Sequence, residues 1–342
     1  MQPGSGTFLL AFALAGIGSP GAAAAQALDH VTIGTNWLAE GEHGGFYQAV
    51  ADGTYAAYGL DVEIVPGGPQ SANRARFIAG QVDFYSGGSL AQFDAARQGI
   101  PTVAVAAIFQ KEPQVILAHP ERGFTRFEDL ASLDTLYLGG EGYDTFFRWM
   151  KAAYPGFRDE QYAPYTFSPA PFIADANSGQ QGYVTSEPFL IMSAAGWTPT
   201  VFLLADAGYN PYATTIETHR DLIERDPDLV QRFVDASIIG WVNYLFGDNA
   251  AANALILADN PDMTPDLLAY SVEAMRDYGI VYSGDAVSGG IGCMTDARHQ
   301  AFYDAMVAAG VVEPGLDVFS VFTTDFVCHG VGLDRIAELS PE

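Results

Sequence analysis

A segment of eight residues, Thr102 to Phe109, constrains the fold of this chain more than any other, because it is almost entirely apolar. It is short enough for a strand, and it lacks the alternation that a strand with one solvated face would show. Strands buried on both faces belong to sheets that helices cover on both sides. The segment therefore predicts an α/β fold, and the apolar runs Val115–Ala118 and Val201–Ala205 fit the same architecture.

The size and charge of the chain narrow its class further. It has 342 residues, which suggests two domains, since domains usually contain roughly 100 to 200 residues. Asp and Glu number 41 and Lys and Arg 15, so the formal net charge is −26. Partners with a phosphate backbone need a basic surface. We therefore expect no nucleic acid partner and no anionic membrane surface.

The N-terminal segment has the pattern of a signal peptide. An apolar stretch from Thr7 to Gly18 precedes the small residues Ala22 to Ala27, as in an h-region followed by a cleavage site. No Lys or Arg precedes Thr7, so an apolar tail on a cytoplasmic protein is the alternative. We expect residues 1–27 to be removed and the chain to be exported to the periplasm, with no lipid anchor, because no Cys lies near the cleavage site.

Cys293 and Cys328 are the only cysteines. An even pair in an oxidising compartment favours a disulfide, while the sequence leaves open that both are unpaired thiols, because it does not show how close their Cα atoms are.

Polar and aromatic residues gather where the first strand ends. Val31 to Ile33 alternates as a strand does, and residues from Phe46 onward recur at helical spacing, so Asn36 to Gly45 is expected to be a loop leading into a helix. Loops at the carboxyl ends of strands bind ligands in α/β folds. Trp37 and His43 would flank such a site. The alternative is that Trp37 is a core residue and His43 a turn residue.

Other segments suggest further parts of a site. Val82 to Tyr85 has the pattern of a short strand, and Ser86 to Ser89 that of a turn opening the next helix, where glycines allow close approach of a ligand to the backbone. An ordinary strand-to-helix turn explains the same residues. Glu187 ends a strand in a polar cluster, a position that is usually solvated. Glu40 and Glu42 could form an acid/base pair, although loop carboxylates usually face solvent.

The common catalytic and cofactor motifs are missing. The sequence has no His-Glu-x-x-His zinc motif, no Gly-x-Ser-x-Gly elbow and no phosphate-binding Gly-x4-Gly-Lys-Ser/Thr loop. Gly140 and Gly142 resemble a dinucleotide fingerprint, but Thr145 stands where the third glycine belongs. We therefore expect no catalytic residue, no metal and no cofactor.

Several segments together resemble the NMT1/THI5-like substrate-binding proteins of bacterial ABC importers. They are Thr35–Trp37, His43–Tyr47, Gly59–Val62, Gly67–Pro69, Gly80–Phe84 and Tyr183–Phe189. The resemblance extends over nearly the whole mature chain. It implies a bilobed periplasmic binding protein fold of type II, in which two α/β lobes are joined by a two-crossing hinge.

In this arrangement lobe 1 would comprise residues 28–117 and 208–342, and lobe 2 residues 118–207. The crossings are expected near Val115 to His119 and Asp206 to Ala213. The resemblance also implies that Trp37 stacks on a ring, with Asn36 and His43 beside it and Glu187 facing it from lobe 2. Ser86, Gly87 and Gly88 would form the floor.

The same family contains an enzyme branch, the eukaryotic pyrimidine-precursor synthase. That branch carries a lysine for pyridoxal phosphate and a histidine consumed in the reaction after the segment that matches Val82-Asp83. Gly87 and Ala91 stand at those places here. Gly208 to Tyr212 replaces the synthase's cysteine-rich iron-binding run. These departures remove the chemistry of the enzyme.

The sequence is thus identified as that of a periplasmic solute-binding component of an ABC importer that captures a small polar heterocycle, with an aminopyrimidine thiamine precursor as the leading ligand. The alternatives are a synthase-like enzyme and a binding protein for riboflavin, sulfonate or nitrate. The partners would be this ligand and an inner-membrane permease, and the protein would be a monomer. The candidate ligand-binding residues are Asn36, Trp37, His43, Tyr47, Ser86, Gly87, Gly88, Phe109, Glu141, Tyr143, Thr145, Glu187 and Tyr212.

Overall fold

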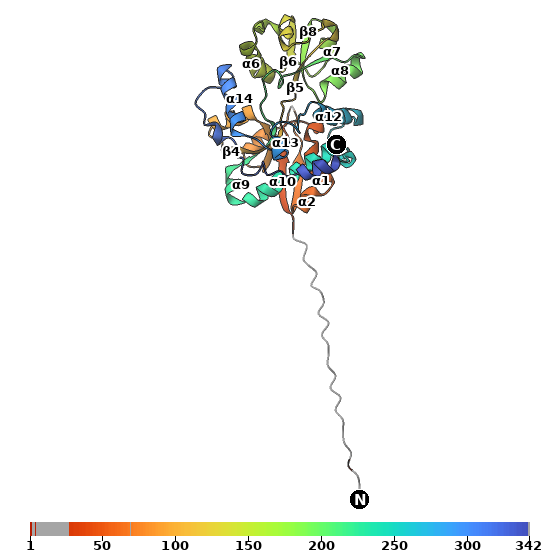
Figure 1. Ribbon diagram of the computed structural model, residues 1–342, viewed down its shortest axis with the longest axis vertical. Helices are drawn as coiled ribbons and strands as arrows, with labels where there is room; N and C mark the ends of the chain where they lie inside the picture. The colour runs from red at the N-terminus through yellow and green to blue at the C-terminus, as the bar shows by residue number, and fades with distance from the viewer. Residues whose placement is uncertain (2–3, 5–26, 69, 341–342) are drawn as a thin grey trace.

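The computed structural model describes residues 1, 4, 27–68 and 70–340. The expected signal peptide falls mostly outside these residues. The described chain forms two α/β lobes, each built on one five-stranded sheet with helices around it (Figure 1). No helix in the described ranges is long and apolar enough to cross a membrane. The two-lobed α/β fold expected from the sequence is confirmed.

The first sheet is mixed, with one antiparallel strand. Its strands, in spatial order, are β2 (Leu60–Val65), β1 (Asp29–Gly34), β3 (Phe84–Gly88), β10 (Ala213–His219) and β4 (Thr102–Phe109). β1 pairs in parallel with β2 and β3, whereas β10 runs antiparallel to β3 and β4. β10 is therefore the strand that returns from the other lobe and completes the sheet.

The second sheet repeats this plan. Its strands, in spatial order, are β7 (Tyr162–Pro164), β6 (Thr135–Leu138), β8 (Ser178–Tyr183), β5 (Gln114–Ala118) and β9 (Thr200–Leu203). β6 is parallel to β7 and β8, and β5 is antiparallel to β8 and β9. In each sheet, therefore, the antiparallel strand is the one that the chain forms directly after it arrives from the other lobe.

The chain crosses between the sheets twice, over 110–113 and over 204–212. The first crossing lies earlier than expected, because Val115 to Ala118 pairs with β8 and β9 and so belongs to the second sheet. A boundary at residue 117 would cut through β5. The second crossing overlaps the expected segment.

Helices cover both sheets. Those of the first lobe are η1 (Gly41–His43), α1 (Gly44–Ala51), α2 (Thr54–Ala57), α3 (Asn73–Ile78), α4 (Ser89–Arg97), α9 (Arg220–Arg225), α10 (Pro227–Phe246), α11 (Ala250–Asp259), α12 (Pro265–Asp277), α13 (Ala286–Gly289), α14 (Asp296–Ala308), η5 (Val318–Ser320) and α15 (Leu333–Leu339). Those of the second lobe are η2 (Pro120–Arg122), η3 (Phe127–Ser132), α5 (Gly140–Asp144), α6 (Phe146–Ala153), η4 (Asp159–Gln161), α7 (Ala170–Ala174) and α8 (Glu187–Ala195).

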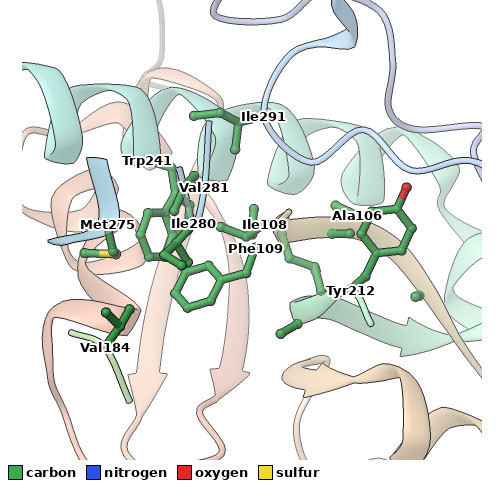
Figure 2. Packing of buried hydrophobic residues seen from close by; sticks show 14 of the residues in the cluster. Ala106, Ile108, Phe109, Val184, Tyr212, Trp241, Met275, Ile280, Val281 and Ile291 are labelled. Atoms are coloured by element: carbon green, nitrogen blue, oxygen red, sulfur yellow. The ribbon is translucent and has the colours of Figure 1, made fainter. Parts of the chain in front are cut away.

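Strand β4 is buried along its whole length, as its apolar sequence predicts. Phe109 at its end has no exposed surface and packs edge-on against Trp241 of α10, with ring centroids 5.7 Å apart (Figure 2). Phe109 is therefore a core residue in this structure. It supports the end of the strand by packing against Trp241.

One local prediction is wrong. Ser86 to Gly88 are not a turn but the last residues of β3, because their backbone pairs with the returning strand β10. The error arises because the conformation of this segment depends on a strand that is distant in sequence.

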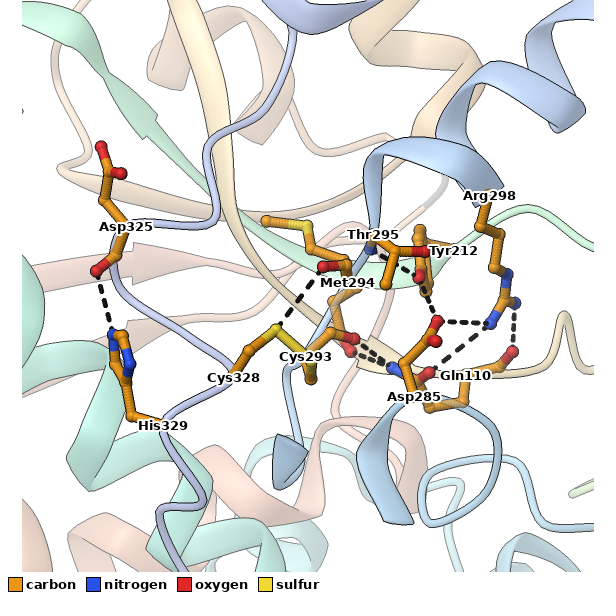
Figure 3. Close-up of a disulfide and its surroundings, with 11 residues drawn as sticks. Gln110, Tyr212, Asp285, Cys293, Met294, Thr295, Arg298, Asp325, Cys328 and His329 are labelled. Carbon is orange, nitrogen blue, oxygen red and sulfur yellow. Dashed lines mark hydrogen bonds and ion pairs between the residues drawn. A yellow bond between two sulfur atoms is a disulfide. The ribbon is translucent and has the colours of Figure 1, made fainter. Parts of the chain in front are cut away.

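The first crossing is braced by the C-terminal part of the chain. Cys293 and Cys328 form a disulfide, and the Gln110 amide donates to the carbonyl oxygen of Cys293 at 2.8 Å (Figure 3). Arg298 lies over the Tyr212 ring, 4.0 Å from its centroid, and donates to the backbone carbonyl of Gln110. One cluster thus holds residues of both crossings.

Candidate functional site

The loop after β1 places Trp37 and His43 on the side of lobe 1 that meets lobe 2. The buried His43 ring donates through Nε2 to Asn36 Oδ1 at 3.1 Å. Burial lowers the pKa of His43 to about 4, so the ring is neutral near pH 7. Asn36, Trp37 and His43 are therefore brought together as expected.

Trp37 touches an aromatic residue from the opposite lobe. Its ring centroid lies 5.6 Å from that of Phe167, which follows β7 in lobe 2, and Phe167 in turn lies 5.3 Å from Tyr165. Phe167 is 66% exposed and has a positive φ of 60°. A bulky side chain is rarely found in that backbone region. Such strain is often found at ligand sites, and here it holds an aromatic face against Trp37.

Glu187 lies beside this aromatic group, at the start of α8. Its Oε2 accepts from the backbone N–H of Tyr183 at 2.7 Å and from Ser186 Oγ at 2.6 Å, and its Oε1 accepts from the Tyr165 hydroxyl at 3.4 Å. These donors fix the carboxylate in one orientation. Burial nevertheless raises the pKa of Glu187 above its ordinary value.

Glu40 and Glu42, expected to face solvent, do not. Glu42 is only 4% exposed and Glu40 is half-buried. The Thr185 hydroxyl of lobe 2 donates to Glu42 Oε1, and Ser271 of α12 donates to the Thr185 carbonyl at 2.7 Å. The expectation failed because lobe 2 covers this loop. Glu40, Glu42 and Glu187 are called the inter-lobe carboxylates below.

The inter-lobe carboxylates are close enough to perturb one another. Burial, together with the negative charges of Glu42 and Glu187, raises the pKa of Glu40 well above its usual range. Burial also raises the pKa of Glu42, and the charge of Glu187 adds to this effect. Within the described ranges, no Lys, Arg or His nitrogen lies within 4.0 Å of a carboxylate oxygen of any of them. The site therefore concentrates three carboxyl groups that no basic side chain of the described residues pairs with.

A second acidic group lies toward the crossings. Glu112, in the first crossing, is buried, and burial together with Glu141 raises its pKa to about 7. Burial raises the pKa of Tyr183 well above its usual value, and Glu112, Glu141, Glu42 and Glu40 all add to the shift. Tyr183 thus lies between the two acidic groups.

The Ser86–Gly88 segment lies beside an ion pair. Arg74 Nη1 is 2.6 Å from Glu217 Oε2, and the Arg74 guanidinium stacks over Tyr85. A Cβ on Gly87 would lie 1.7 Å from Glu217 Oε1. Glycine is therefore required at position 87 to make room for the buried carboxylate of β10.

Other candidate residues point elsewhere. The Tyr47 hydroxyl donates to Asp259 on α11, and the Tyr143 hydroxyl donates to Asp159 on the outer part of lobe 2. Thr145 donates to the Glu141 carbonyl. Tyr212 donates to Asp285 within the bracing cluster of Figure 3. With Phe109 in the core, these five support the scaffold, while Glu141 contributes charge.

Sequence reasoning missed Tyr165, Phe167 and Thr185 and set aside Glu40 and Glu42. Tyr165 and Phe167 lie in a stretch without periodicity, which gives no burial signal. The signal that could have identified these residues was the high density of aromatic and acidic residues in the three loops that contain them. In the described part of the chain, no group of three His, Cys, Asp or Glu side chains could hold a metal ion.

A family model and a curated relative both match most of this chain. The model of the family described as NMT1/THI5 like matches residues 40–249, well over half of the chain. The riboflavin-binding protein RibY of Chloroflexus aurantiacus is 25% identical over 320 residues, which cover 91% of this chain and 90% of RibY.

Solved structures share the fold at low identity. A putative periplasmic sulfonate-binding protein SsuA from Methylobacillus flagellatus KT superposes with a TM-score of 0.60 and 14% identity, over 92% of this chain and 95% of SsuA. The desulfurization enzyme DSZB has a TM-score of 0.57 and 14% identity, over 90% of this chain and 99% of DSZB. At such identities the likeness concerns the fold alone.

Proposed function

Since the chain belongs to the NMT1/THI5-like family, we propose that it is the periplasmic solute-binding component of an ABC importer and captures a small, flat heterocycle rich in N–H donors. An aminopyrimidine thiamine precursor is the leading ligand. The observation that carries this proposal is the pairing of Trp37 and Phe167 beside the inter-lobe carboxylates. The partner would be an inner-membrane permease, and the protein would act as a monomer.

The chemistry of the ligand follows from these groups. Aromatic faces from both lobes favour a flat ring, and ionised carboxylates only accept hydrogen bonds, so they favour a ligand that offers donors. A sulfonate or nitrate needs Arg or converging N–H groups. The guanidinium of Arg74, which lies beside the Ser86–Gly88 segment, is already paired with Glu217. An anion would therefore be repelled.

Riboflavin is the second candidate ligand. RibY, the relative described above, is named as a riboflavin-binding protein, and the flat ring system of riboflavin would also suit the Trp37–Phe167 pair. What favours the smaller, donor-rich ring is the concentration of carboxyl groups, because their oxygens require hydrogen-bond donors.

A synthase-like activity has little support in the site. The position of its lysine is occupied by Gly87, and any side chain there would collide with Glu217. Lys111 and Lys151 are the only lysines, and they pair with Asp206 and Asp159. Neither lysine is therefore free to form a Schiff base in the site, and we propose a binding role without catalysis.

Calorimetry tests the ligand assignment. Trp37→Ala should weaken binding of a formylated or free aminopyrimidine by about 1 to 3 kcal/mol, because stacking on an aromatic ring is lost. Trp37→Phe, which keeps an aromatic face, is the matched control and should retain most of the affinity. Glu187→Gln should cost roughly 1.5 to 3 kcal/mol, since a charge-assisted hydrogen bond is lost. Riboflavin is titrated in parallel as the second candidate. Binding of taurine or nitrate, with no binding of any heterocycle, would refute the assignment.

Solution scattering tests the two-lobe clamp. A ligand bound between the lobes should stabilise the closed arrangement, so saturating aminopyrimidine should reduce the radius of gyration relative to the free protein. Trp37→Ala at the same ligand concentration should show a smaller change. Identical curves for free and saturated wild type would contradict closure around the ligand.

A further inference from the structure

One oxygen atom in the site lacks a partner. Glu42 Oε1 accepts from Thr185, but Glu42 Oε2 is buried and has no hydrogen-bond partner in the described structure. The residue itself is 4% exposed. A buried carboxylate oxygen without a donor is costly, because it has lost its water and gained nothing in exchange. It lies close enough to Glu40 and Glu187 for their charges to interact, and its lone pairs are free to accept a hydrogen bond.

Among the described residues, no basic side chain stabilises the ionised form of these carboxyl groups. Thr185 is a neutral donor, and the adjacent His43 is uncharged because burial lowers its pKa to about 4. Burial raises the pKa values of Glu40, Glu42 and Glu187, and the neighbouring carboxylates raise that of Glu40 further. A bound cation would stabilise the ionised forms that the protein alone disfavours.

The form of the site favours an organic cation over a metal ion. The carboxylates are not grouped as metal ligands within the described residues. They lie instead beside two aromatic rings from opposite lobes. Aromatic faces attract cations, and planar delocalised cations satisfy both the rings and the carboxylates.

We propose that Glu42 determines specificity for positive charge: its free Oε2 accepts an N–H from a flat organic cation whose ring lies against Trp37 and Phe167. This inference rests on the proposed solute-binding role and narrows its ligand class. Because Thr185 of lobe 2 fixes Oε1, the acceptor is oriented only when the lobes are together. Charge recognition and closure are therefore coupled at this residue.

Cation binding should also release protons. The ionisable groups around Glu42 are Glu40, Glu187, His43, Tyr183 and Tyr244. His43 is neutral and the pKa values of both tyrosines are raised, so the carboxyl groups, whose pKa values burial raises, are the groups that a bound cation would ionise. A bound cation favours their ionised forms and lowers their pKa.

The test uses two probes of one shape. 4-Amino-1-methylpyridinium is a permanent cation, and 4-methylaniline is its neutral isostere. Calorimetry at about pH 7 should show that wild type binds the cation about tenfold more tightly or better, since charge-assisted hydrogen bonds exceed neutral ones by this order. The heat should differ between buffers of different ionisation enthalpy, which reports the released protons.

Variants isolate the role of Glu42. Glu42→Gln should reduce the preference for the cation about tenfold, whereas Glu224→Gln, at an exposed position on α9, should leave it unchanged. Thermal melting establishes that each variant is folded. If Glu42→Gln does not fold, the inference is tested by the wild-type preference for the cation and by the proton release on binding.

The outcomes separate this inference from the proposed function. Equal binding of both probes by wild type, or an unchanged preference in folded Glu42→Gln, would overturn the inference while heterocycle binding could stand. Absence of binding of either probe would also overturn it, and the aminopyrimidine and riboflavin titrations then decide the proposed function independently. Exclusive binding of taurine or nitrate would overturn both.

Discussion

Gly45→Ala is expected to lower the free energy of unfolding by about 3 kcal/mol, the upper part of the range for an added methyl group in a packed core. Gly45 lies in α1, which packs against α10, and a Cβ there would lie 2.2 Å from Cγ of Trp241. Trp241 has no exposed surface and is held by Phe46 and Phe109. The indole therefore has no free space into which it could move (Figure 2).

Urea unfolding followed by circular dichroism measures this effect. Gly140→Ala is the matched control, because a Cβ on Gly140 meets no atom within 4 Å. The control should change the stability by less than about 1 kcal/mol, as expected of an exposed substitution. Equal stability of Gly45→Ala and the wild type would show that the contact between α1 and α10 adapts at little cost.

The glycines at 44 and 45 have a packing role that the sequence analysis did not predict. They lie in His43–Tyr47, a segment that carries part of the family resemblance. In the structure, Cβ atoms on Gly44 and Gly45 would lie 2.1 and 2.2 Å from Tyr244 and Trp241. These glycines allow α1 to approach α10, and that contact holds the loop with Trp37.

The elements that follow from local pattern were predictable. The apolar run of β4 matches its expected position, because a strand that is buried on both faces is recognisable from consecutive apolar residues. The end of β3 was missed, since Ser86 to Gly88 are strand only through pairing with β10, more than 100 residues later.

The site was predictable only in part. Trp37 and Glu187 were singled out, and the structure brings both to the contact between the lobes. Glu42 was set aside because exposed loop carboxylates are common, and its burial depends on Thr185 of the other lobe. A local sequence pattern does not show which loops two lobes press together.

Glu112→Gln is expected to stabilise the protein at about pH 8 by on the order of 3 kcal/mol and to have little effect near pH 4. Burial, with the charge of Glu141, raises the pKa of Glu112 from 4.5 to about 7. Between these values the folded state keeps a proton that the unfolded state has released, so the stability present below pH 4.5 falls as pH rises and is fully lost above about 7. The pKa of Glu112 lies about 2.5 above its ordinary value, and at about 1.36 kcal/mol for each pKa unit this gives the expected gain in stability.

The measurement is urea unfolding of wild type and variant across this pH range. Glutamine keeps the oxygen that accepts from the backbone N–H of Gln114 at 3.3 Å, so the substitution removes the charge and leaves this contact in place. Glu273→Gln, at an exposed position of α12, is the control and should not alter the slope of stability against pH. Glu112→Gln should keep part of the dependence of stability on pH, because the pKa values of the buried carboxyls of Glu42 and Glu217 are also raised. A variant no more stable than wild type at pH 8 would mean that Glu112 is ionised at no cost and that water reaches the first crossing.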